Sequence, residues 1–254
     1  MTPMKRVVLV VLGLLGGWTV SSFVAAGALE LGNWDLPLSS SLGDEVGRTV
    51  RKVGEGMILD DRRMPVSVLA LVNVPLWFGL AGVPWLMRRS GLDWKRDLGW
   101  SMRWVDVPLG LALGLSLQFL LVPLYEIVFL VFGEQDVSGP ARSLAGAIDT
   151  PLDLIGLLVM TVVAAPLCEE IAFRGMLFRG IRDMEAGHVG SGVALAVVVS
   201  SVLFAGSHFQ LVQFPGLLVF GLAAALLFQR TNRLGTAIWT HVGFNLTTVV
   251  LLLL

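Results

Sequence analysis

The feature that most constrains this sequence is a stretch, residues 189–229, that contains no Asp, Glu, Lys or Arg. A bilayer core accommodates an apolar helix of about 20 residues, so the stretch is long enough for two crossings with a turn near residues 210–215. Only 15% of the whole chain is charged, whereas soluble domains carry charge on about a quarter of their residues. The sequence therefore argues against a water-soluble fold.

Further apolar runs of spanning length lie on both sides of this stretch. Each is long enough for one helix: residues 7–29, 64–87, 107–133, 154–178 and 236–254. The count predicts an all-α, polytopic integral membrane helix bundle with about seven transmembrane helices, between six and eight. The first run is longer than the apolar part of a signal peptide, about 7 to 15 residues, so we expect a retained anchor.

Basic residues in the connections predict the orientation, because short loops rich in Lys and Arg stay in the cytoplasm. The connections at residues 88–103, 179–188 and 230–233 are basic and are expected inside, while residues 133–149, with a single Arg, are expected outside. We therefore expect an integral protein of the cell membrane with a cytoplasmic N-terminus. Residues 30–63 are the exception, because they combine many acids with five basic residues: Arg48, Arg51, Lys52, Arg62 and Arg63.

Charge and cysteine content exclude several classes of partner and site. A formal net charge of −1 offers no basic surface for a nucleic acid, and membrane lipid is the expected environment. The single cysteine, Cys168, excludes an internal disulfide framework and a cysteine-rich zinc site. Without an internal repeat or a separable soluble part, residues 1–254 are expected to form a single membrane domain.

Three charged residues interrupt the apolar run at residues 154–178. An unpaired charge inside a bilayer costs roughly 3 kcal/mol or more, so each needs a reason. Glu170 and Arg174 have the favoured i, i+4 spacing with the acid first, and are expected to pair. Glu169 points about 100° away from Glu170 and has no partner three or four residues along the helix. A desolvated carboxylate of this kind suits general-base catalysis, which makes Glu169 the strongest catalytic candidate.

Two later apolar runs add histidines. His208 lies in the uncharged stretch, and His241 shares one helix face with Asn245, four residues later. Together with Glu169, these are residue types that activate a water molecule and stabilise an oxyanion. Two histidines and a carboxylate also form an allowed catalytic zinc set, so Glu169, His208 and His241 are the metal ligands if a metal is present. Spacing alone leaves both open, a Zn²⁺ cofactor and a metal-free glutamate mechanism.

The order of these motifs resembles a known family. EExxxR at residues 169–174, FxxxH at 204–208 and HxxxN at 241–245 follow one another, separated by apolar helices. This pattern is similar to the CPBP family, which includes the type II CAAX prenyl endopeptidases and the bacteriocin-processing and abortive-infection-like membrane proteases. The resemblance covers residues 151–254, the expected catalytic core, and leaves residues 1–150 as accessory helices and loops.

The resemblance implies a role for each residue at a matching position. It implies an intramembrane endopeptidase acting on a membrane-delivered peptide or lipidated protein substrate. Glu169 and His208 would activate the attacking water. His241 and Asn245 would stabilise the oxyanion, and Glu170 with Arg174 would support the site.

Two other classes of function remain open from the sequence. A proton-coupled transporter would use intramembrane acids and histidines as a relay, and a non-catalytic, bacteriocin-immunity-like membrane protein would need no chemistry. One geometric conflict also remains. Simple alternation of full spans separates His208 and His241 by about 20 Å in depth. A short or broken helix near Gly206 and a deep entry at Thr236 would bring them together.

Overall fold

The computed structural model describes residues 2–32, 65–185 and 191–254, and every regular element within them is helical. Six helical stretches in these residues are long and apolar enough to cross a membrane: Pro3–Leu31, Val66–Met87, Asp106–Phe132, Pro151–Met184, Phe214–Thr231 and Leu234–Leu253. A seventh apolar helix, Gly192–Gly206, is shorter. The prediction of an all-α membrane bundle with six to eight spans is confirmed, and the protein is an integral membrane protein.

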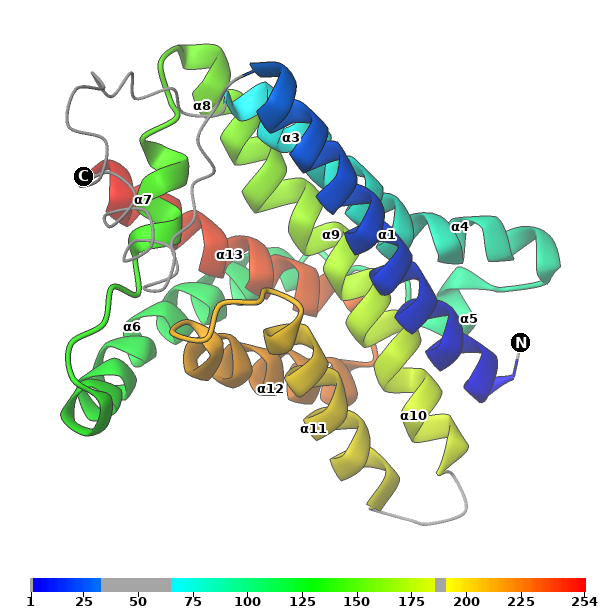
Figure 1. Ribbon diagram of the computed structural model, residues 1–254. Helices are drawn as coiled ribbons and strands as arrows, with labels where there is room; N and C mark the ends of the chain where they lie inside the picture. The colour runs from blue at the N-terminus through cyan, green and yellow to red at the C-terminus, as the bar shows by residue number, and fades with distance from the viewer. Residues whose placement is uncertain (1, 33–64, 186–190) are drawn as a thin grey trace, which may run out of the picture.

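The individual elements divide between the two halves of the chain (Figure 1). The first half contains α1 (Pro3–Gly32), α3 (Val66–Trp77), the π-helical η1 (Phe78–Gly82), α4 (Val83–Met87), the 3₁₀ turn η2 (Arg88–Ser90), α5 (Trp94–Leu98), α6 (Asp106–Phe132) and α7 (Gly139–Ala145). The second half contains α8 (Pro151–Leu158), η3 (Val159–Ala164), α9 (Ala165–Glu170), η4 (Ile171–Phe178), α10 (Arg179–Met184), α11 (Ser191–Gly206), α12 (Phe214–Thr231) and α13 (Leu234–Leu253). The five basic residues between positions 48 and 63 lie outside the described residues.

Helices α6 and α13 form the closest helix pair of the bundle. Gly110 and Gly114 of α6 face α13 so closely that a Cβ at either position would collide with the α13 backbone. Small residues allow this approach, which is how transmembrane helices pack without a hydrophobic driving force between them. At the N-terminal ends, buried Asp106 binds Arg233 Nη2 at 2.5 Å and accepts a hydrogen bond from Thr236 Oγ1 at 2.8 Å. The start of α13 is therefore fixed against α6.

One long composite helix, residues 151–184, carries the predicted carboxylates. It begins at a capping box in which Thr150 and Asp153 bind each other's backbone N–H groups, with Pro151 in the first turn. The π-helical stretches η3 and η4 then flank α9 on both sides. Such wider turns bond each residue to the fifth one along and are frequent at functional sites. They accommodate Pro166 of α9, which has no N–H to donate.

Helix α11 is too short to carry His208 to the far side of the bundle. Its 16 residues extend about 24 Å, and the chain then turns through residues 207–213 before α12 begins. In Figure 1 this connection lies in the interior of the view, next to α12 and α13. His241 stands seven residues into α13, about 10 Å from its start. The depth conflict is resolved because α11 stops early and His241 lies two turns deep.

Candidate active site

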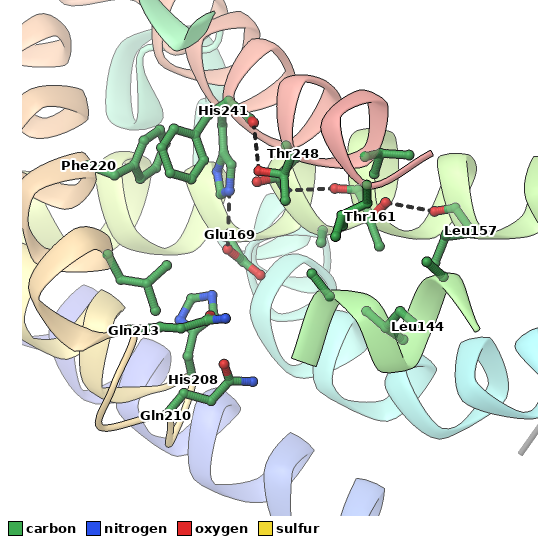
Figure 2. A pocket seen from close by; sticks show the side chains of 18 of the residues that line it. Leu144, Leu157, Thr161, Glu169, His208, Gln210, Gln213, Phe220, His241 and Thr248 are labelled. Carbon is green, nitrogen blue, oxygen red and sulfur yellow. Dashed lines mark hydrogen bonds and ion pairs between the residues drawn. The ribbon is translucent and has the colours of Figure 1, made fainter. Parts of the chain in front are cut away.

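A cavity of about 300 Å³ lies between the composite helix, the 207–213 connection, α7, α12 and α13. The side chains of Glu169, His208, His241 and Asn245 all line it, although they come from three separate stretches of the chain. Figure 2 shows the Glu169 carboxylate between the two imidazoles in this view. The structure therefore brings all four sequence-predicted catalytic candidates together.

Glu170 and Arg174 lie behind the cavity and form the ion pair expected from their spacing. Arg174 Nη1 binds Glu170 Oε1 at 2.8 Å, and neither side chain is more than 1% exposed. Arg174 Nη2 also donates to the carbonyl of Gly221 at 3.2 Å, and its guanidinium lies 4.6 Å from the ring centroid of Phe204. The cation is thus compensated by a carboxylate, a carbonyl and an aromatic face, as a buried charge requires.

Glu170 has a second partner that the sequence does not reveal. His241 Nδ1 lies 2.9 Å from Glu170 Oε1. Because the paired carboxylate only accepts hydrogen bonds, Nδ1 carries the hydrogen and donates it. This bond fixes the direction of the imidazole and leaves Nε2 toward Glu169, whose Oε2 is 3.8 Å away. A carboxylate behind an imidazole is the usual arrangement for orienting a functional histidine.

Glu169 differs from its neighbour in its position, because it lines the cavity and Glu170 does not. Each carboxylate has a buried Oε2 atom without a hydrogen-bond partner, and the Glu169 side chain retains 14% exposure. Leaving a buried carboxylate oxygen without a partner is costly. A structure tolerates such a cost most readily where the group has to bind a substrate or a water molecule.

His208 and Asn245 are each held by one hydrogen bond to a backbone carbonyl. His208 Nδ1 lies 2.9 Å from the carbonyl oxygen of Phe204. A carbonyl only accepts, so Nδ1 donates and Nε2 is left as an acceptor. Asn245 Nδ2 donates to the Thr161 carbonyl at 2.8 Å. Since an amide nitrogen carries two hydrogens, the second remains available to an oxyanion in the cavity.

The predicted zinc set is incomplete in this arrangement. Glu169 and His241 face each other, at the distance given above, but no group of three His, Cys, Asp or Glu side chains in the described residues is close enough to hold a metal ion. The three residues therefore do not form a ready zinc site.

Two contributors to the cavity were missed by the sequence analysis. Helix α7, in the connection expected outside, supplies part of the lining, and so do Gln210 and Gln213 of the turn after α11. Gln213 Nε2 donates to the carbonyl of Val137 at 2.8 Å, and the Gln213 carbonyl accepts from Tyr125 Oη at 3.2 Å. These bonds link the 207–213 connection, which carries His208, to the segment that precedes α7. The sequence signal that could have identified this part of the lining is the pair of glutamines, Gln210 and Gln213, in a stretch without charged residues.

A comparison with known protein families covers the segment that contains the four catalytic candidates. Residues 151–247 match the model of the type II CAAX prenyl endopeptidase Rce1-like family. The matched segment begins with α8 and ends within α13, so it contains all four residues named above, and the family resemblance of the sequence motifs is confirmed. The match covers less than half of the chain, and α1 to α7 lie before it. No curated protein and no solved structure matches the chain.

Proposed function

Residues 151–247 form a domain of the type II CAAX prenyl endopeptidase family, and from this premise we propose that the protein hydrolyses a peptide bond of a membrane-delivered substrate. The family match supports the general class of function, a CAAX-type intramembrane protease. The observation that carries the specific proposal is the partly exposed Glu169 side chain, which lines a cavity among the membrane-spanning helices together with His208, His241 and Asn245. A carboxylate in that position is available to accept a proton from water.

In the proposed mechanism, Glu169 removes a proton from a water molecule with help from His208. The resulting hydroxide attacks the peptide carbonyl carbon, and the carbonyl oxygen becomes an oxyanion. The free amide hydrogen of Asn245 and the Nε2–H of His241 stabilise this oxyanion. For His241 to donate from Nε2 while Nδ1 donates to Glu170, the imidazole carries both hydrogens, and the Glu170 carboxylate at 2.9 Å offsets its charge. The proton on Glu169 then passes to the leaving amine.

The cavity suits a substrate that is polar at one end and apolar along its length. Its polar lining includes Glu169, His208 and His241, and its apolar lining comes from several helices, including Leu144 of α7, Phe220 of α12 and Leu252 and Leu253 of α13. We propose a peptide or a lipidated protein as the substrate, delivered through the membrane lipid. Residues 151–254 would act as the catalytic core and residues 1–150 as accessory helices and loops.

Loss of hydrolysis in Glu169→Gln is the principal test. Purified wild-type protein in detergent is incubated with a peptide library, with and without a chelator, and cleavage is read by mass spectrometry. Removal of a general base typically costs about 10²- to 10⁴-fold, so Glu169→Gln should lose at least 100-fold in turnover. Glu126→Gln is the matched control, because Glu126 is an exposed acid of α6 that is not part of the cavity lining.

Wild-type turnover in a folded Glu169→Gln protein would remove the proposed mechanism. Solute uptake driven by a pH gradient, without any peptide cleavage, would favour the transporter class instead. Loss of cleavage in the presence of the chelator would indicate a metal-dependent reaction, and unchanged cleavage would indicate a metal-free one.

A further inference from the structure

The residue after His208 has an unusual backbone conformation. Phe209 has a φ of 52°, and it is one of two non-glycine residues with positive φ in the described residues. This left-handed region is unfavourable for a residue with a Cβ, and a bulky residue there points to a local constraint or strain. Surrounding contacts must select this conformation over its alternatives.

The ring of Phe209 makes the contact that can select it. Phe209 is 67% exposed, and its ring packs on Trp18 of α1 with a centroid distance of 4.0 Å and a tilt of 40°. His208, one residue earlier, lines the cavity instead. The left-handed turn thus sends consecutive side chains in different directions, one to α1 and one to the catalytic candidates.

Helix α1 offers a firm support for this contact. Gly17, the residue before Trp18, packs so closely against Pro75 and Leu76 of α3 that a Cβ would collide with their backbone. One turn earlier, Gly13 makes the same kind of contact with Gly79. Because these contacts hold α1 closely against α3 and η1, the backbone that carries Trp18 has a fixed place.

We propose that Trp18 is a positioning residue, which holds Phe209 in its left-handed conformation and thereby directs His208 into the cavity. Trp18 lies outside the segment that matches the protease family and is not part of the cavity lining. It acts only through the connection that carries His208. The effect on turnover rests on the proposed function, whereas the effect on the position of His208 does not.

The kinetic test compares Trp18→Ala, Trp18→Phe and Phe209→Ala in detergent. Misplacing a catalytic group by about 1 Å can cost about 100-fold, so Trp18→Ala and Phe209→Ala should each lower kcat by about 10- to 100-fold with little change in KM. Trp18→Phe keeps an aromatic face and should restore most of the loss. Phe23→Ala is the matched control, because Phe23 is an exposed aromatic residue of the same helix and should keep wild-type kinetics.

A second measurement is independent of catalysis. Diethyl pyrocarbonate modifies accessible imidazoles, and peptide mapping by mass spectrometry reports the rate at His208 and His241 separately. In Trp18→Ala the rate at His208 should change at least threefold, while the rate at His241 and both rates in Phe23→Ala stay at wild-type values.

The two readouts separate the possible failures. If the wild-type protein has no peptidase activity but the labelling rate at His208 changes in Trp18→Ala, the proposed function is rejected and the positioning role is kept. Unchanged labelling and unchanged kcat in Trp18→Ala would overturn the inference. If Trp18→Ala does not fold, Phe209→Ala decides by the same criteria.

Discussion

Glu169 and Glu170 are adjacent in sequence, yet their surroundings assign them different work. Glu170 is fully buried and is bonded to both Arg174 and His241. Glu169 lines the cavity, and its Oε2 atom lies 3.8 Å from His241 Nε2, beyond hydrogen-bond distance. A bound carboxylate is suited to orienting other groups, and an unbound one to accepting a proton. The roughly 100° between consecutive helical residues is enough to separate the two roles.

Replacing Arg174 by leucine should destabilise the protein strongly. Arg174→Leu leaves the Glu170 carboxylate buried with His241 as its partner, and breaking a buried ion pair in this way costs about 3–5 kcal/mol. The free energy of unfolding, measured by denaturant titration in detergent micelles, should fall by that amount. Arg142→Leu breaks the exposed pair with Asp136 and should cost no more than about 1 kcal/mol. Equal losses in the two variants would contradict the assigned role.

Sequence spacing predicted one of the two bonds of Glu170 and could not predict the other. The pair with Arg174 follows from the i, i+4 rule within a single helix. The bond from His241 joins residues 71 positions apart, and it depends on how two helices pack. The same limit hid the bond from Asn245 to Thr161. Local patterns therefore identify the site residues, while the tertiary packing determines which atoms remain free.

At the scale of elements, α7 closes one side of the cavity with small residues. Ala141 and Ala145 contribute to the lining together with Leu144, and their short side chains leave space that larger ones would occupy. Val137, just before α7, is also linked to the 207–213 connection, because its carbonyl accepts a hydrogen bond from Gln213 Nε2. Helix α7 is therefore suited to limit the size of the substrate group that reaches the site.

Filling this space should alter substrate selection. In Ala145→Phe a ring projects into a cavity of about 300 Å³, so cleavage of peptides with bulky apolar residues should fall at least tenfold relative to peptides with small ones. Competition between the two peptide sets in a single reaction measures the ratio. Ala112→Phe places the same ring on the exposed face of α6 and should leave the ratio unchanged. An unchanged ratio in Ala145→Phe would show that α7 does not limit the substrate.

Most boundaries of the long apolar helices could be predicted to within a few residues, because apolar runs end where charged residues return, but the helix predicted to end at residue 178 continues to Met184. The run at residues 107–133, for example, became α6 at Asp106–Phe132. The end of α11 was predicted less closely, because no charged residue marks it: the turn expected near residues 210–215 begins at residue 207. The role of α7 also escaped prediction, because its segment was read as an external loop.

For the whole molecule, the distribution of basic residues predicts a cytoplasmic N-terminus. If the N-terminus is cytoplasmic, Lys95 lies inside and Glu134 lies outside. In a Cys168→Ser background, a membrane-impermeant maleimide should label Glu134→Cys on intact cells and Lys95→Cys only after permeabilisation. Both positions are exposed in the structure. The reverse labelling pattern would show that the orientation is inverted.

The glycine contacts between α6 and α13 have a consequence for how a polypeptide could enter. A backbone-to-backbone contact without intervening side chains leaves these two helices almost no freedom to separate or slide, and the Asp106 bonds fasten the same pair at one end. Admission of a substrate chain must then depend on movement elsewhere around the cavity. We expect this movement in α7, a seven-residue helix that lines the cavity within the connection between α6 and α8, so the helix that limits the substrate would also admit it.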